Sequence, residues 1–281
     1  MKLVRHGPKG QEKPGIVDAD GQVRDLSGHV ADIDGALLAN GLDAVRALDP
    51  ASLPLVPAAT RLAEPVAKVG KFICIGLNYS DHAAESGMPI PEEPIIFTKA
   101  ISAIIGPNDT VLLPPTSTKS DWEVELGVVI GTEARYVTQE AALDHVAGYC
   151  VINDLSEREY QLERGGTWDK GKGCDTFGPF GPWLVTADEI ADVGSLGLWL
   201  DVNGARMQTG NTSSLIFGIA HLVHYVSQFM SLQPGDIIST GTPPGVGLGM
   251  KPPVFLKEGD VITLGIDGLG EQRQEVRRYG A

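Results

Sequence analysis

The stretch Asp121-Trp-Glu-Val-Glu-Leu-Gly-Val-Val-Ile130 decides how the rest of the chain is interpreted, because it places two glutamates in an apolar run typical of a β-strand. Side chains two residues apart on a strand point to the same face, so Glu123 and Glu125 project together. Asp154 ends the next apolar run, residues 147–154. The three carboxylates are therefore expected at neighbouring strand ends, where sheets often place their chemistry.

Two carboxylates on one buried face repel each other and favour protonation unless a cation lies between them. Oxygen ligands alone select Mg²⁺, Mn²⁺ or Ca²⁺ over zinc. The alternative is an amphipathic strand with both glutamates in solvent, the commoner setting of an isolated Glu-x-Glu pair. Residues 127–130 contain no further polar side chain, so the sequence predicts a metal site at Glu123, Glu125 and Asp154.

The chain is acidic, with 281 residues and a formal net charge of −14. No run of Lys and Arg offsets that charge, which disfavours nucleic acid and anionic membranes as partners. The amino terminus lacks the apolar stretch of a signal peptide and no later run reaches membrane length, so we expect a soluble cytoplasmic protein. Three widely spaced cysteines form no C-x-x-C pair and predict free thiols: Cys74, Cys150 and Cys174.

The pattern predicts a mainly β protein with some helix, in two parts: residues 1–67 as a small β-rich domain and linker, and 68–281 as the catalytic domain. Asp20-Gly21 predicts a hairpin in the first part, followed by a helical stretch over 34–48 and a Pro-rich linker over 50–65. In the second part the clearest helix is predicted over 213–230. Short strands are predicted over 71–75, 94–98, 123–130, 146–153, 196–202, 236–240 and 260–266, without the regular alternation of a doubly wound sheet.

A second group of polar residues has the spacing of a catalytic dyad. His82 and Glu85 are three residues apart at the start of a predicted helix, so they share one face. A carboxylate beside an imidazole fixes its tautomer and raises its basicity, which suits a general base. Breakers in Gly87-Met-Pro-Ile-Pro flank this helix and suggest a lid, although a surface ion pair would give the same spacing. His221 and His224, within the long helix, are not assigned to the site.

Two further segments are expected to reach the same ligand. Ser156-Glu-Arg-Glu159 has the pattern of a capping box and predicts a helix presenting Arg158 and Gln161, where Arg158 could bind a carboxylate or remain in solvent. A glycine-rich loop after residue 165 carries Lys170 and Lys172. The Gly-rich stretch over 240–249 is no dinucleotide fingerprint, because it contains two prolines and precedes no helix, and is expected to present Thr242.

Together these segments resemble the fumarylacetoacetate hydrolase family over residues 70–279. The resemblance implies a mixed β-sandwich roll, a homodimer, and a Mg²⁺ or Mn²⁺ ion on Glu123, Glu125 and Asp154. It also implies that His82 and Glu85 activate water and that Lys172 stabilises an oxyanion. The substrate contacts that it implies are Arg158, Gln161, Thr242, Tyr79 and Lys99.

Members of this family cleave or rearrange 2-oxo acids, so the resemblance leaves the reaction open. We expect hydrolysis of the C–C bond of a 2,4-dioxo acid to pyruvate and a carboxylic acid, since the dyad supplies the base that an attacking water requires. The loop around Lys172 resembles that of members acting on 2,4-diketo-3-deoxy sugar acids and, more distantly, on maleylpyruvate; Gly173-Cys174 departs from the Ser-Phe of many relatives. The alternatives are an oxaloacetate decarboxylase, a 2-oxo acid isomerase or hydratase, and a non-catalytic binding protein for metal and sugar acid.

Overall fold

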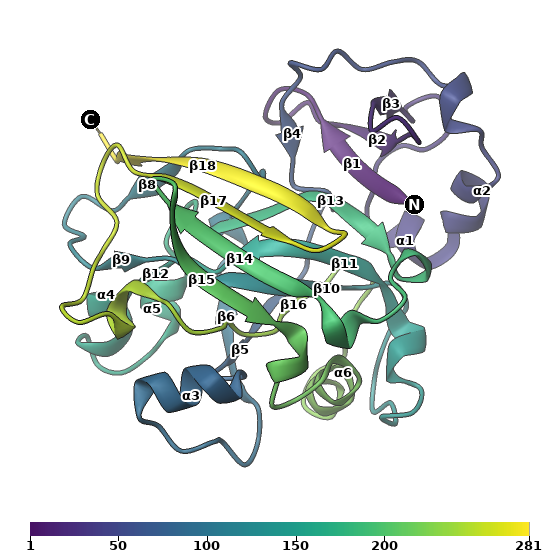
Figure 1. Cartoon of the computed structure of the whole chain (residues 1–281). Coiled ribbons are helices and arrows are strands. Elements are labelled where there is room, and N and C mark those ends of the chain that lie inside the picture. The colour runs from purple at the N-terminus through teal and green to yellow at the C-terminus, as the bar shows by residue number, and fades with distance from the viewer. Residues whose placement is uncertain (281) are drawn as a thin grey trace.

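The glutamate-bearing strand lies in the middle of a large mixed sheet (Figure 1). The computed structural model describes residues 1–280, apart from the side chain of Ser86. Strand β10 (Val124–Ile130) is buried along its whole length and pairs with β11 (Val146–Asn153) and β16 (Ile237–Ser239). The other strands of this sheet are β1 (Lys2–His6), β2 (Lys13–Val17), β3 (Val23–Asp25), β4 (Leu62–Ala63), β5 (Phe72–Gly76), β6 (Ile95–Lys99), β7 (Ile104–Ile105) and β13 (Gly178–Thr186).

A second sheet packs on one face of the first, as expected for a β-sandwich. Its order is β15-β14-β17-β18-β8, and the apolar side chains between the two sheets form one core. A short antiparallel pair joins the segments before β10 and after β11. The strands of the second sheet and of the short pair are β8 (Val111–Leu113), β14 (Gly197–Val202), β15 (Ala205–Asn211), β17 (Val261–Ile266), β18 (Gly270–Arg278), β9 (Ser120–Asp121) and β12 (Ser156–Glu157).

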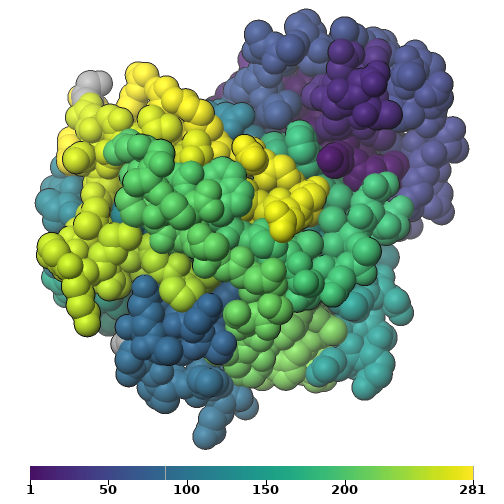
Figure 2. Space-filling view, viewed as in Figure 1, coloured from purple at the N-terminus to yellow at the C-terminus, as the bar shows by residue number. Residues whose placement is uncertain are grey.

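The amino-terminal segment packs on the opposite face of the large sheet and appears as a lobe beside the rest of the molecule (Figure 2). The predicted hairpin is present, with Ile16 of β2 opposite Arg24 of β3. Strand β1 pairs with β13, so these amino-terminal strands extend the large sheet. The division at residue 67 stays a prediction, although one apolar cluster joins Leu3 and Leu38 to Phe72 and Ile237 across it.

Helices are short and lie at the margins of the sheets. Asp34 caps the first of them by accepting hydrogen bonds from two backbone N–H groups. Among residues 1–280, no helix is long and apolar enough to cross a bilayer. The helices are α1 (Gly35–Asn40), α2 (Leu42–Arg46), α3 (Ser80–Ser86), α4 (Arg158–Leu162), α5 (Asp169–Lys172) and α6 (Ile219–Ser227).

The predicted mainly β fold is confirmed, and each of the predicted strands is present within two residues of its expected bounds. The long helix is shorter than predicted: α6 begins at Ile219 because Leu215 bridges to Tyr79 and the next two residues bond Asn78. The backbone carbonyl of Asn78 accepts from Ile216 N at 2.8 Å, and its side chain accepts from Phe217 N at 2.8 Å. Tertiary hydrogen bonds therefore override the helical pattern before residue 219.

Candidate active site

The alternation of side chains along β10 brings the carboxylates to one cavity. Val124, Leu126 and Val128 face the core between the two sheets, whereas Val129 faces the opposite cluster. Glu123 directly precedes the first paired residue of β10. It lies on the same face as Glu125, the face that points away from the core between the two sheets. These glutamates are only 6% and 2% exposed, so the alternative of a solvated strand face is wrong.

The three predicted metal ligands come together. Glu123, Glu125 and Asp154 each offer an oxygen within 4.8 Å of the others, and all three are buried. The backbone explains this proximity, because Asp154 N donates to Glu123 O at 2.9 Å. Oε2 of Glu125 accepts from the Ser239 hydroxyl at 2.6 Å and from Gly241 N at 2.9 Å. Among the described residues, its other oxygen has no hydrogen-bond donor.

Two buried lysines hold this carboxylate group from one side. Lys172 Nζ lies 2.6 Å from Glu123 Oε2 and 2.8 Å from Asp154 Oδ2. Lys99 Nζ lies 2.6 Å from Asp154 Oδ1. Burial favours the neutral form of Glu123, but Lys172 and Arg158 outweigh burial and lower the pKa of Glu123 to about 2. Glu125 differs, because burial and the charges of Asp154 and Glu123 raise the pKa of this carboxyl well above its ordinary value.

These contacts fit a divalent cation. Together with buried Asp121, the site holds four carboxylates against the cationic side chains of Lys99, Lys172 and Arg158. Among the residues that the structure describes, one carboxylate therefore lacks a cationic partner, and Glu125 is the one without an ion pair. A carboxylate oxygen that accepts one hydrogen bond keeps a second lone pair for a metal. An oxygen-only set of this kind suits Mg²⁺ or Mn²⁺.

Arg158 lies beside the carboxylates and is itself held in place. Its Nε donates to Asp121 Oδ2 at 2.8 Å, one terminal nitrogen donates to Glu123 at 2.7 Å, and the other donates to Gln161 Oε1 at 3.0 Å. Asp121, which the sequence patterns did not single out, is fully buried. It also accepts from the backbone N–H groups of Gly247 at 2.6 Å and Leu248 at 3.0 Å. Asp121 thus ties Arg158 to the loop that follows β16.

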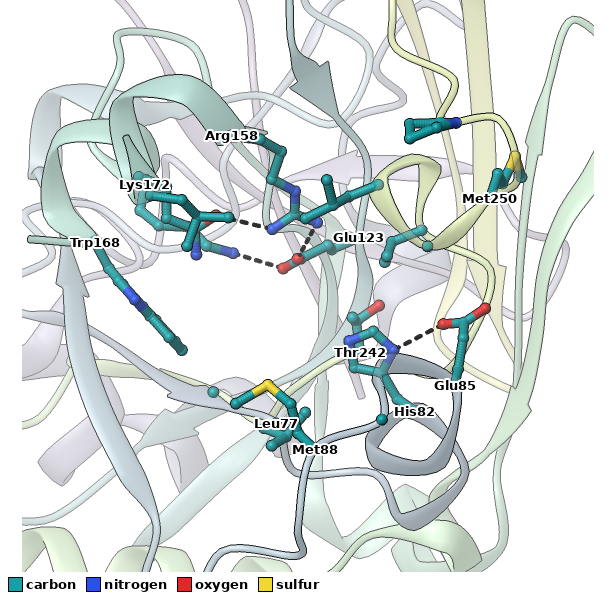
Figure 3. Close-up of a pocket in the computed structure, with 18 of the residues that line it drawn as sticks. Leu77, His82, Glu85, Met88, Glu123, Arg158, Trp168, Lys172, Thr242 and Met250 are labelled. Carbon is teal, nitrogen blue, oxygen red and sulfur yellow. Dashed lines mark hydrogen bonds and ion pairs between the residues drawn. The ribbon is translucent and has the colours of Figure 1, made fainter. Parts of the chain in front are cut away.

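The predicted dyad lies across the cavity from the carboxylates (Figure 3). His82 Nδ1 is 3.0 Å from Glu85 Oε2, and both residues are on α3. Because the carboxylate can only accept, it favours the tautomer with hydrogen on Nδ1, which leaves Nε2 able to take a proton. Glu85 also accepts from Gly245 N at 3.1 Å, so α3 is fastened to the loop after β16.

The cavity between these groups has a volume of about 710 Å³. Its polar wall comes from the carboxylates, their neighbours and the dyad. Its apolar wall comes from α3, the segments around α4 and α5, and the loop after β16. The polar residues that line it are His82, Glu85, Glu123, Glu125, Arg158, Gln161, Lys172, Thr242 and Lys251.

Three residues predicted to contact the substrate either do not line the cavity or have their polar group already hydrogen-bonded within the protein. Lys99 is 3% exposed and lies behind Asp154. Tyr79 is fully buried and does not line the cavity, and the Tyr79 hydroxyl has no hydrogen-bond partner among the described residues. Thr242 lines the cavity, but its hydroxyl donates to Val124 O at 2.9 Å and accepts from Gln208 Nε2 at 2.8 Å. Substrate contact by these three residues stays a prediction. His224, left unassigned, bonds Val137 O and does not line the cavity.

Two local predictions around the site need correction. The predicted helix presenting Arg158 and Gln161 is present as α4, but Ser156 does not begin it: Ser156 belongs to β12, and α4 starts at Arg158, capped by the Glu157 carboxylate on Tyr160 N at 2.8 Å. The residues expected to form a glycine-rich loop, Asp169–Lys172, form α5. Gly171 is needed there for close packing rather than flexibility, because a Cβ at this position would lie 2.3 Å from Glu157 O.

Cys174 is a poor nucleophile in this setting. The free thiol is half-buried and its Sγ lies 3.6 Å from Lys170 O. Burial raises the pKa of Cys174 to about 11. Because thiolate is the reactive form, the chemistry is left to the carboxylates, the lysine and the dyad.

Comparison with known proteins decides the family. Residues 71–277 match the fumarylacetoacetate (FAA) hydrolase C-terminal family. The chain belongs to the fumarylacetoacetate hydrolase family. A Burkholderia ambifaria relative of this family is 63% identical over 279 residues, covering 99% of each chain, and its name proposes a hydrolase without giving a substrate.

Solved structures of this family that resemble the chain differ in their reactions. Maleylpyruvate hydrolase from Sphingobium sp. SYK-6, solved with manganese(II) and pyruvate, is 32% identical with a TM-score of 0.82 and 99% coverage of both chains. A 5-carboxymethyl-2-hydroxymuconate delta-isomerase from Mycobacterium smegmatis is also 32% identical, with a TM-score of 0.78 and full coverage of both chains. Family membership therefore supports an enzyme and leaves its substrate open.

Proposed function

We propose that the protein is a divalent-metal-dependent hydrolase that cleaves the bond between C3 and C4 of a 2,4-dioxo acid, giving pyruvate and a carboxylic acid. The observation that carries this proposal is the His82–Glu85 pair, 3.0 Å apart, in the cavity that Glu123 and Glu125 also line, across from Glu123 in Figure 3. A base placed across the cavity from an electrophile-holding site is what hydrolysis requires. The Sphingobium relative, named as a hydrolase of maleylpyruvate, acts on a substrate of this class.

Glu123, Glu125 and Asp154 would hold Mg²⁺ or Mn²⁺, which would supply a Lewis acid that stabilises negative charge developing on the substrate. Arg158 and Gln161 orient the substrate carboxylate from the adjacent wall. Lys172, held between Glu123 and Asp154, provides a positive charge near the oxyanion formed on C4.

The dyad carries one proton from the attacking water to C3 of the substrate. His82 Nε2 takes a proton from water as the water oxygen bonds to C4. When the C3–C4 bond breaks, its electron pair passes to the pyruvate enolate, and the proton on His82 moves to C3. Glu85 keeps the imidazole oriented and stabilises its charged form during these steps.

The runner-up reaction is isomerisation of a 2-oxo acid, favoured by the likeness to the Mycobacterium smegmatis isomerase. In that case the dyad would move a proton between carbons and no water would be consumed. Decarboxylation of oxaloacetate would need the metal but no attacking water, so it would not require His82.

The test is pyruvate release from acetylpyruvate, maleylpyruvate, a 2,4-diketo-3-deoxy sugar acid and oxaloacetate, with and without Mg²⁺ or Mn²⁺. We expect metal-dependent cleavage of at least one dioxo acid, and a decrease in kcat of about 10²- to 10⁴-fold in His82→Ala. The matched control is His145→Ala, a half-buried histidine outside the cavity, which should retain wild-type kcat. Turnover of oxaloacetate alone, unchanged in His82→Ala, would replace the hydrolase with a decarboxylase.

A further inference from the structure

The cavity has two chemically different ends. Glu123, Glu125, Arg158, Gln161 and Lys172 form one end, which matches the pyruvate half of the proposed substrate, and the dyad faces this end across the cavity. Beyond these groups, Lys251 is the only charged side chain among the described residues that line the cavity. The remaining large side chains of the lining are apolar: Ile75, Leu77, Met88, Phe97, Leu162, Trp168, Val246, Leu248, Met250 and Pro253.

An aromatic wall is built into the apolar end. The indole of Trp168 lies against the backbone of Gly76 at the end of β5, so closely that a Cβ on Gly76 would be 2.5 Å from its ring. Phe97 meets Trp168 edge to face, with ring centroids 5.3 Å apart, and its ring lies 5.1 Å from Lys172 Nζ. The wall therefore runs directly from the lysine of the polar end. In Figure 3 Trp168 lies below Lys172, and Leu77 and Met88 lie beside His82.

The rim of the cavity is also apolar although it is open to solvent. Met88, Leu162 and Leu248 are 50%, 48% and 38% exposed, and each comes from a different segment of the chain. Exposed apolar side chains that converge on one cavity mark a binding surface rather than a solvated face. With a volume of about 710 Å³, the cavity has room well beyond a three-carbon pyruvate unit.

From these observations we infer that the substrate is a 2,4-dioxo acid whose acyl group is a medium-length alkyl chain or an aromatic ring, held by Leu77, Met88, Leu162 and Trp168. This inference rests on the proposed function and selects among its substrates. A polyhydroxylated sugar chain would lose hydration at this end without gaining hydrogen-bonding side chains. A second carboxylate could reach only exposed Lys251, and a solvent-exposed ion pair contributes little.

The test compares kcat/KM for hexanoylpyruvate, benzoylpyruvate, acetylpyruvate, maleylpyruvate and the sugar acid with the metal-loaded enzyme. Full burial of one methylene is worth about fourfold, so the four additional methylenes of hexanoylpyruvate should raise kcat/KM at least about tenfold over acetylpyruvate. We expect the two apolar substrates to exceed maleylpyruvate and the sugar acid. The opposite order, or equal values for hexanoylpyruvate and acetylpyruvate, overturns the inference.

Two rim variants and a matched control locate the effect. Leu162→Ser and Met88→Ser should each lower the ratio of hexanoylpyruvate to acetylpyruvate kcat/KM at least about threefold. Leu143→Ser removes a leucine that is 45% exposed but lies outside the cavity, so it should leave this ratio unchanged. A ratio that is equally unaffected in all three variants places the acyl group elsewhere and contradicts the inference.

Calorimetry separates this inference from the proposed function. In His82→Ala loaded with Mn²⁺, hexanoylpyruvate should bind at least about tenfold more tightly than acetylpyruvate, with a more negative heat-capacity change. Equal cleavage of both dioxo acids would refute the inference alone. If neither is cleaved, the proposed function fails, and the two dissociation constants still decide whether the apolar end binds an apolar chain.

Discussion

Two charge clusters, one half-buried and one fully buried, use opposite arrangements. In the amino-terminal lobe, Arg5 pairs with Asp32 and Glu64 at 2.8 Å and lies 3.9 Å from Glu12, and Arg61 pairs with Asp109 at 2.6 Å. Each of these acids has an arginine partner, and hydrogen bonds and arginine charges outweigh burial and lower the pKa of Glu12 and of Asp109. In the cavity, Glu125 has no cationic partner and its pKa is raised. A cluster in which each carboxylate contacts an arginine serves stability, whereas one with an unpaired carboxylate is prepared for a ligand.

The largest expected effect comes from removing one cation from each cluster. Lys172→Met leaves Glu123 and Asp154 short of a partner and should lower the free energy of unfolding of the metal-free protein by about 3–5 kcal/mol. Arg5→Met should cost about 3 kcal/mol, since Asp32 and Glu64 keep partial access to solvent. Urea unfolding measures both.

Added Mn²⁺ distinguishes the two variants. It should restore part of the stability of Lys172→Met, because the cation replaces the lost charge between carboxylates, and none of that of Arg5→Met. Equal restoration in both variants would show that the two clusters do not differ as described.

A smaller effect is expected from neutralising one acid in each cluster. Glu125→Gln should weaken Mn²⁺ binding by more than about 100-fold, beyond the loss typical of residues that only support a ligand. The metal-free stability should be unchanged or higher, because folding no longer has to bury a carboxyl group that burial and two neighbouring carboxylates disfavour in its charged form. Glu64→Gln is the control and should leave the Mn²⁺ dissociation constant unchanged. Isothermal titration calorimetry and urea unfolding provide the two readouts.

The clusters should also respond to pH with opposite signs. A lowered carboxyl pKa stabilises the protein above the unfolded value, and this stability is lost as pH falls through the folded value. The ordinary pKa values of Glu12 and Asp109 are 4.5 and 3.8, and Arg61 helps to lower both in the folded protein. The stability of Arg61→Met should therefore fall less than that of wild type as the pH drops below 4.5. Because the pKa of Glu125 is raised in the folded protein, wild type loses stability as pH rises. The free energy of unfolding of metal-free Glu125→Gln should therefore increase relative to that of wild type from pH 5 to 8. Each slope is at most about 1.4 kcal/mol per pH unit per carboxylate, and parallel slopes would contradict the comparison.

The smallest effect is expected at Cys174, which lies near the cavity cluster without belonging to it. With a pKa of about 11, about one thiol in a thousand is ionised at pH 8. Cys174→Ser should change kcat by less than about twofold, and alkylation by iodoacetamide should be slow at pH 8 and accelerate up to about pH 11. Loss of activity in Cys174→Ser would assign the thiol a role that the carboxylate cluster does not explain.

Sequence patterns predicted the strands and residues whose signals are local. Glu123, Glu125, His82 and Glu85 are close in sequence, and the alternation of β10 is strong enough to show which side chains share a face. Strands β13 and β18 were not predicted, because Gly178–Thr186 is rich in Gly and Pro and Gly270–Arg278 is largely polar. Their pairing partners stabilise them against these preferences.

The parts of the site that were not predicted depend on distant contacts. Asp121 alone before a tryptophan has no local pattern, and its buried position beside Arg158 and the Gly247 backbone appears only in the folded chain. The aromatic wall joins Gly76, Phe97 and Trp168 from three separate segments. Lys99 was predicted as a substrate contact, yet its position behind Asp154 depends on how β6 meets the end of β11.

The carboxylate of Asp121 has a consequence for how this enzyme can change its specificity over evolution. It fixes Arg158 beside the polar end and, through the backbone at Gly247 and Leu248, the loop that closes the apolar end. Mutations in that loop are therefore transmitted to Arg158 and to α4, which carries Leu162, whereas Met88 follows α3, a helix that Asp121 does not bond. New substrate ranges should arise by exchange at Met88 first, with the loop after β16 changing last.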